Sequence, residues 1–173
     1  VIGRDLGSMG TLVRARRSEH IAVVMTRGEV RAVLAEMTGE CGLAATVMYG
    51  CGLRLSECLR LRVQDIDFGA NEILVRNGKG GKDRVTMLPD SLKGPLRDQL
   101  RCAKVVHQHD LAAGWGRVVM PGALDRKYPN AAAEWRWQWA FPQERRWKNM
   151  RTGEQGRHHM HATVLQRAVK EAV

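Results

Sequence analysis

Long apolar runs and paired cysteines are both missing from this sequence of 173 residues. No stretch approaches the ~20 apolar residues of a membrane-spanning helix, and none has the form of a secretory signal peptide. The cysteines lie singly within apolar helical patterns, without the spacing of a disulfide framework or a zinc site; they are Cys41, Cys51, Cys58 and Cys102. Such thiols are typical of the reduced core of a cytoplasmic protein.

Acidic residues are also scarce, with 18 Asp and Glu against 28 Lys and Arg, which leaves a net charge of +10. This balance favours a polyanionic partner, nucleic acid first and an anionic membrane surface second, over a basic domain whose charge is only solvated. The length suits one domain with its own core. Residues 1–25 resemble a linker in which Arg14, Arg16 and Arg17 either follow a phosphate backbone or belong to a loose end.

Apolar periodicity then predicts two core helices. Thr26 and Glu29 form a capping-box pattern ahead of apolar residues at helical spacing up to Met37. We expect Gly39 and Gly42 to break this helix, and residues 43–49 to form a second helix that ends in the glycines of YGCG.

Arg54 opens a third predicted helix, and its side chain lies off the apolar stripe of Leu55, Cys58 and Leu59. A guanidinium in this place can give a phosphate two parallel hydrogen bonds, and Glu57, one turn on, can hold it. The alternative is a solvated surface charge.

Two short strands follow, around Ile73–Val75 and around Val85–Met87, joined by the segment NGKGGKDR at residues 77–84. Lys79 and Lys82 lie on this glycine-rich hairpin, where a lysine either donates a proton to an oxygen leaving phosphorus or is merely solvated. A Walker phosphate loop is disfavoured because such a loop joins a strand to a helix.

A long helix is expected from Asp90 or Ser91 to about residue 113, with Leu92, Leu96, Leu100 and Val105 on its core side. In residues 121–143, Asn130 before a run of alanines favours a further helix. Trp135 and Trp139 would then share one stripe, and Trp137 and Phe141 another. One stripe either stacks on an unpaired base or contacts another protomer, or both stripes are buried.

The last part of the sequence begins with a polar, basic stretch at 143–157, which we expect to be a loop. A helix with apolar residues from Val164 to Ala172 follows it. His158, His159 and His161 precede this helix. No acidic or thiol ligand clusters with them, so they are interpreted as nucleic-acid contacts or plain surface residues rather than metal ligands.

Together these motifs resemble the catalytic domain of a tyrosine recombinase and, within that family, an integron integrase. The resemblance rests on YGCGLRLSECLRLRVQDIDF, GKGGKDR, ALDRKYPN, EWRWQW and HHMHATVLQRAVKEAV, and spans about residues 26–173. It implies a mostly helical α+β fold with a small antiparallel sheet and an inserted helix. Residues 1–25 would be an interdomain linker remnant and 26–173 a truncated catalytic domain, with the family's insertion at about 121–160.

The resemblance also implies a chemistry. A tyrosine attacks a DNA phosphodiester and forms a 3′-phosphotyrosine, without metal, nucleotide or other cofactor. Arg54 matches the first phosphate-binding arginine, Glu57 its acidic companion and Lys79 the lysine that protonates the leaving oxygen. The DNA-binding positions would be Lys82, Arg84, Trp135, Trp137, His158 and His159, the last four against extrahelical bases of a folded single strand. The resemblance further implies a tetramer on DNA in the bacterial cytoplasm.

The family's His-x-x-Arg box and nucleophilic tyrosine have no match in this sequence. Tyr49 lies in an apolar pattern and Tyr128 belongs to the insertion motif. We therefore expect these 173 residues to bind DNA without cleaving it, and the last helix to leave apolar surface uncovered. The alternative is a basic DNA- or RNA-binding module without chemistry.

Overall fold

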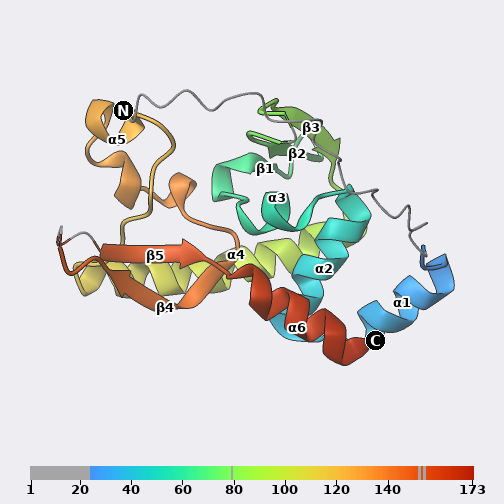
Figure 1. Ribbon diagram of the computed structural model, residues 1–173. Helices are drawn as coiled ribbons and strands as arrows, with labels where there is room; N and C mark the ends of the chain where they lie inside the picture. The colour runs from blue at the N-terminus through green and yellow to red at the C-terminus, as the bar shows by residue number, and fades with distance from the viewer. Residues whose placement is uncertain (1–23, 79, 152, 154) are drawn as a thin grey trace, which may run out of the picture.

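The computed structural model describes residues 24–78, 80–151, 153 and 155–173 (Figure 1). The linker arginines Arg14, Arg16 and Arg17 and the hairpin lysine Lys79 lie outside the described residues. The helices are α1 (Arg27–Glu36), α2 (Gly39–Cys51), α3 (Leu55–Leu59), α4 (Asp90–Ala112), α5 (Leu124–Lys127) and α6 (Ala162–Ala172), with 3₁₀ turns at Val63–Asp65, Ala131–Ala133 and Trp135–Trp137. The strands are β1 (Ile66–Asp67), β2 (Glu72–Val75), β3 (Arg84–Met87), β4 (Pro142–Lys148) and β5 (Gln155–His159).

The predicted capping box at the start of α1 is confirmed. The Glu29 backbone N–H donates to Thr26 Oγ1 at 3.3 Å, and the Thr26 backbone N–H donates to Glu29 Oε2 at 2.6 Å. The expected break at Gly42 is wrong, because Gly42 lies inside α2. A Cβ there would be 2.6 Å from the Met37 carbonyl oxygen, so glycine is needed for close packing of the α1–α2 turn rather than to end a helix.

The strands expected on either side of the glycine-rich hairpin are present. β1, β2 and β3 form an antiparallel sheet in that order, with Ile73 opposite Thr86 and Val75 opposite Arg84. Thr86 Oγ1 donates to the Cys51 carbonyl at 2.8 Å and so ties β3 to the end of α2. The sheet therefore lies above α3 (Figure 1). The helix α3 itself begins where the third helix was expected.

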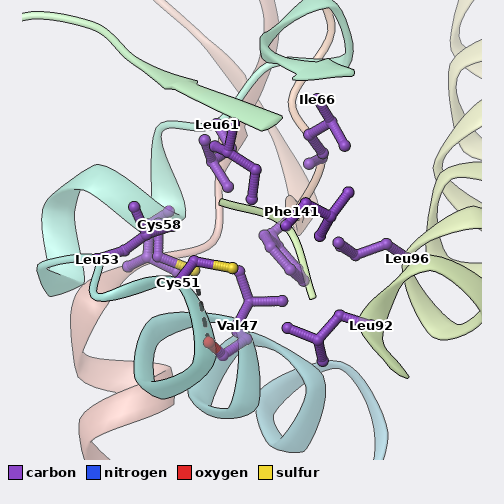
Figure 2. Close-up of a cluster of buried hydrophobic side chains, with 14 of the residues drawn as sticks. Val47, Cys51, Leu53, Cys58, Leu61, Ile66, Leu92, Leu96 and Phe141 are labelled. Carbon is purple, nitrogen blue, oxygen red and sulfur yellow. Dashed lines mark hydrogen bonds between the residues drawn. The ribbon is translucent and has the colours of Figure 1, made fainter. Parts of the chain in front are cut away.

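Phe141 is the centre of the main core. Its side chain is fully buried, and Figure 2 shows it between Val47 of α2 and Leu92 and Leu96 of α4, with Leu61 above. The segment that follows the tryptophan-rich stretch therefore threads back into the body of the domain. Cys51 and Cys58 are buried free thiols in the same core, whereas Cys102 is exposed, contrary to its expected core position.

The buried stripe of α4 differs from the expected one in its second half. Leu92 and Leu96 are buried, but Val105 is 53% exposed, and Ala103, His107 and Asp110 are buried instead. Two of these three are polar, because this half of α4 lies under the tryptophan-rich segment and the β4–β5 hairpin and bonds to them. An apolar pattern in the sequence does not reveal a stripe of that kind.

The inserted segment is not the continuous helix that its alanines suggested. Trp135–Trp137 is a single 3₁₀ turn between extended residues, and Trp139 pairs with Arg62 as an isolated bridge. The Gln138 amide donates to three backbone carbonyls, those of Gly116, Ala132 and Glu134. The backbone also bonds to other segments, since the Val63 N–H donates to the Gln138 carbonyl and the Val118 N–H to the Ala132 carbonyl, both at 3.0 Å. Tertiary contacts therefore override helix propensity.

Residues 143–157 are likewise not a loop. β4 and β5 pair antiparallel, with Arg146 opposite Arg157 and Trp147 opposite Gly156, and an irregularity in register near the start of β4. The final helix is present as expected. Its Leu165 and Val169 line an apolar groove of about 510 Å³ shared with α1 and α2. No helix in the described part of the chain is long and apolar enough to span a membrane.

Candidate functional site

Arg54 precedes the first turn of α3, and most of its side chain remains accessible. Its backbone is extended, and its N–H donates to Glu57 Oε2 at 2.8 Å, so the Glu57 carboxylate caps the helix start. The Arg54 Nη1 donates to Glu57 Oε1, also at 2.8 Å, while the side chain stays 56% exposed. The remaining guanidinium donors are therefore oriented by Glu57 and open to an anion.

Glu57 is a buried carboxylate, with a side chain only 6% exposed. Burial raises the pKa of Glu57, but the hydrogen bonds from Arg54 and the charges of Arg84 and Arg54 more than offset it, so the net pKa is lowered. Glu57 therefore stays ionised near neutral pH and keeps two guanidinium groups fixed beside one another.

Arg84 supplies the second guanidinium, from the first residue of β3. Its Nη2 donates to Glu57 Oε2 at 2.9 Å and to the Gly52 carbonyl at 3.2 Å. Gly78, on the other arm of the hairpin, lies so close that a Cβ there would be 3.3 Å from Glu57 Oε1. The base of the glycine-rich hairpin is therefore bonded to and packed against the start of α3, and Lys82 is exposed on the hairpin.

A hollow of about 320 Å³ opens beside this cluster, and we call it the Glu57 hollow. It brings together groups from distant parts of the sequence; its charged and imidazole residues are Glu57, Arg60, Arg62, Asp65, Arg76, His158 and His159. Five of these are arginine or histidine residues beyond the Arg54–Glu57 pair. The hollow is thus suited to an anionic ligand that extends away from Arg54.

His158 and His159 are held by aromatic neighbours. The His158 ring stacks on Trp147 with centroids 4.9 Å apart, and His159 meets Trp139 edge-on at 5.2 Å. The His159 Nδ1 donates to the Met160 carbonyl at 2.8 Å. Burial, and then the charge of His159, lowers the pKa of His158, so this ring is neutral at pH 7 and available for stacking or hydrogen bonding to a base.

The two tryptophans predicted to contact DNA do not lie together. Trp137 is half-buried near the Arg62 guanidinium, whose carbon is 5.6 Å from the ring centroid. Arg62 and Trp139 line the Glu57 hollow, so Trp137 adjoins it through Arg62 rather than lining it. Trp135 lies on His107 of α4, with ring centroids 5.9 Å apart, and lines a different groove. Arg54, Glu57, Arg84, Trp137 and both histidines therefore form one neighbourhood, and Trp135 lies outside it.

Two buried residues that hold the segments around this neighbourhood were not found from the sequence. Arg62 is 7% exposed and donates to the Trp137 carbonyl at 2.6 Å and the Val119 carbonyl at 2.8 Å, with its guanidinium 4.0 Å from the centre of the Trp139 ring. Asp110 is 3% exposed and accepts hydrogen bonds from Arg157 and Arg146. Their partners are tens of residues away, so no local pattern marks them. Within the described residues, no three His, Cys, Asp or Glu side chains cluster as metal ligands.

Comparison with known proteins identifies the family to which this chain belongs. Residues 24–171 match the model of the Phage integrase family, and the chain therefore belongs to the phage integrase family. Its α+β fold, mostly helical with small antiparallel sheets, is the one expected for a tyrosine recombinase catalytic domain.

An integrase/recombinase of Escherichia coli is 44% identical over all 173 residues, which cover 51% of that protein. The chain thus spans about half the length of this relative. The tyrosine recombinase XerA of Pyrococcus furiosus is 42% identical over 59 residues, 34% of this chain and 21% of that protein. A crystal structure of XerA recombinase matches 50% of this chain and 32% of its own at 24% identity with a TM-score of 0.44, which is too partial to add to the fold assignment.

Proposed function

We propose that these residues are the phosphate-binding and base-binding part of an integron integrase, a site-specific recombinase that integrates and excises gene cassettes through a 3′-phosphotyrosine intermediate. The observation that supports this most directly is the Arg54–Glu57–Arg84 cluster. One exposed guanidinium, fixed by a buried carboxylate at a helix start and joined to a lysine-bearing hairpin, suits the charged transition state of phosphoryl transfer.

In this proposal Arg54 binds the non-bridging oxygens of the scissile phosphate, and Glu57 orients it. Lys79, between the first two glycines of the hairpin, gives a proton to the 5′ oxygen as the phosphorus–oxygen bond breaks. Lys82 contacts the adjacent backbone. Arg84 holds the hairpin against α3, so its contribution to DNA binding is partly indirect.

The Glu57 hollow would receive an extrahelical base of a folded single-stranded site. His158 and His159 line the hollow with Trp139 and offer aromatic surface and ring nitrogens, and Trp137 stands against Arg62, another lining residue. Arg60 and Arg76 lie along the same hollow for the neighbouring phosphates. Stacking of one base on an aromatic side chain contributes roughly 1–3 kcal/mol. Double-stranded sites would bind by the phosphate contacts alone.

The second arginine, the His-x-x-Arg box and the nucleophilic tyrosine have no match in these residues. We therefore propose that the 173 residues bind DNA but do not cleave it, and that a whole recombinase of this kind acts as a tetramer on its site. The domain division into a linker at 1–25, a catalytic part at 26–173 and an insertion at 121–160 belongs to the same proposal.

Binding to a DNA hairpin with two unpaired bases, against the same hairpin fully paired, tests the proposal across a salt series. Arg54→Gln should weaken both complexes and reduce the log–log salt slope by about 0.9, because one phosphate contact is lost. His159→Ala should remove the preference for unpaired bases and leave the paired hairpin unchanged. His109→Ala, an exposed histidine on α4, is the matched control and should change neither.

Equal affinity for the two hairpins, with the same steep salt slope in every variant, would mean that the chain is a general basic DNA-binding module. Tighter binding of a folded RNA than of either DNA hairpin would favour the RNA-binding alternative.

A further inference from the structure

A second basic groove runs along α4 and shares no lining residue with the Glu57 hollow. It encloses about 430 Å³, and its lining side chains are Arg97, Asp98, Leu100, Arg101, Lys104 and Trp135, with Gly94 leaving one end open. We call it the α4 groove. Neither the arginine-helix motif nor the hairpin motif includes any residue of α4.

Three cations follow one face of the helix. Arg97, Arg101 and Lys104 stand at positions i, i+4 and i+7, and all three are exposed. Seven helical residues advance about 10 Å, which is the length of roughly three nucleotides at 3.4 Å each. The Arg97 guanidinium is steadied over the Phe68 ring at 4.7 Å, and Asp98 pairs with Arg101, so net positive charge remains along the groove.

Trp135 forms an aromatic wall at the end of this cation row. Trp135 is half-buried. Its ring packs against that of His107, a buried residue in the second half of α4. A ring that is packed on one side and lines a basic groove on the other has the form of a base-stacking platform. An acidic peptide would use the cations but would have no use for the flat aromatic surface.

We propose that the α4 groove binds a short single-stranded nucleic-acid segment of about three nucleotides, with phosphates on Arg97, Arg101 and Lys104 and a base stacked on Trp135. This rests on the proposed function, which expects Trp135 to meet an unpaired base, and deepens it by giving that base a separate contact surface with its own phosphate-binding residues on α4. It also explains why Trp135 lies apart from Trp137 and the two histidines.

Fluorescence anisotropy with a labelled oligothymidylate of about 12 nucleotides, and with an abasic strand of the same length, tests this proposal. The wild-type chain should bind the thymidylate roughly fivefold or more tightly than the abasic strand. In a His159→Ala background, which removes the base contact proposed for the Glu57 hollow, Trp135→Leu should abolish that difference, and Trp135→Phe should keep most of it. The double substitution Arg101→Gln with Lys104→Gln should lower the salt slope by about 1.4, two contacts at ~0.7 each.

The matched control removes Arg167 and Lys170 of α6, which are exposed and also three residues apart, as glutamines. It should leave most of the affinity and slope intact, and thermal melting should show all exposed-residue variants folded.

Equal losses in the two double variants, or a base preference that survives Trp135→Leu, would overturn the proposal. So would oligoglutamate binding as tightly as the strand, which would make the groove a protein-docking surface. The bulged-hairpin preference assigned to His159 should persist in the α4 variants, so either proposal can fail alone.

Discussion

The arginine cluster and the β4–β5 hairpin border the same hollow, but contacts of different range hold them. Arg54 and Glu57 are three residues apart, and Arg84 reaches Glu57 across 27. The hairpin is fixed through Asp110, which binds Arg146 across 36 residues and Arg157 across 47. The first region is therefore built within one helix start and one adjacent sheet, whereas the second exists only when α4, β4 and β5 have already come together.

This difference predicts different sensitivities. The arginine cluster is partly exposed, so water screens its ion pairs and replaces lost bonds. The Asp110 cluster is buried, so removing one partner leaves charged groups unpaired away from water. Substitutions should therefore cost more stability in the hairpin region and more ligand affinity in the arginine cluster.

Asp110→Asn should have the largest effect, destabilising the chain by about 3–5 kcal/mol because Arg157 and Arg146 lose a buried carboxylate. Urea unfolding would measure the loss, and hydrogen exchange should show β4 and β5 amides opening first. Asp98→Asn is the control, since that carboxylate is 65% exposed and pairs only with Arg101 at the surface; it should cost under about 1 kcal/mol. Equal costs would contradict the expectation that burial of the carboxylate decides the loss.

The Asp110 contribution also has a pH signature. Burial raises the pKa of Asp110, but the hydrogen bonds and charges of Arg157 and Arg146 outweigh it and lower the pKa below the ordinary 3.8. A lowered folded-state pKa means that the stabilisation is complete above that ordinary value and is lost as the pH falls through the folded value. Acid unfolding of the wild-type chain should therefore begin below about pH 4, and Asp110→Asn should remove part of that dependence.

Arg62→Lys should cost about 2 kcal/mol, because a lysine cannot reach both the Trp137 and Val119 carbonyls or lie flat on Trp139. Tryptophan emission should shift as those rings become wetter, and the preference for unpaired bases should fall. Arg60→Lys, two residues earlier and exposed, should leave both stability and emission unchanged. An unchanged emission in Arg62→Lys would show that the tryptophan-rich segment holds its place without this arginine.

Glu40→Gln should have a smaller effect that depends on pH. Gln99 Nε2 donates to Glu40 Oε1 and to the Ala140 carbonyl, which ties α2 and α4 to the segment before Phe141. Burial raises the pKa of Glu40 to about 7, against a lowering hydrogen bond from Gln99. Wild-type stability should then fall as the pH rises from 4.5 to about 7 and level off above it.

The substitution removes this titration and should stabilise the chain by about 1–2 kcal/mol at pH 8, with almost no change at pH 4. Urea unfolding at the two pH values measures it. A gain of equal size at both would mean that the effect has nothing to do with ionisation.

The helix start at Arg54 and its pairing with Glu57 could be predicted because their signals are local, whereas the bond from Arg84 to Glu57, across 27 residues, could not. The capping residues of α1, the glycine-rich hairpin and the helix start at Arg54 are all specified by neighbours within a few positions. The tryptophan-rich segment was wrongly predicted to be a helix, because alanines and alternating tryptophans suit one. In the structure, the side chains of Gln138 and Arg62 donate hydrogen bonds to its backbone carbonyls instead. The β4–β5 hairpin was missed because its inward-facing residues are charged, and only the distant Asp110 makes their burial tolerable.

The smallest effect is expected within the arginine cluster itself. Arg84 is 37% exposed, and a lysine in its place keeps one bond to Glu57 while losing the bond to the Gly52 carbonyl. Arg84→Lys should therefore cost about 1 kcal/mol or less, and slightly weaken binding to duplex DNA through a looser hairpin.

The same substitution at Arg157, which is 12% exposed and bonds Asp110 with two nitrogens, should cost about 3 kcal/mol. Chemical denaturation of the two variants side by side gives the most direct measure of the comparison. If Arg84→Lys were as costly as Arg157→Lys, the arginine cluster would be part of the stabilising framework rather than a site that the framework supports. The exposed guanidinium of Arg54 would then have to be explained by something other than an anionic ligand.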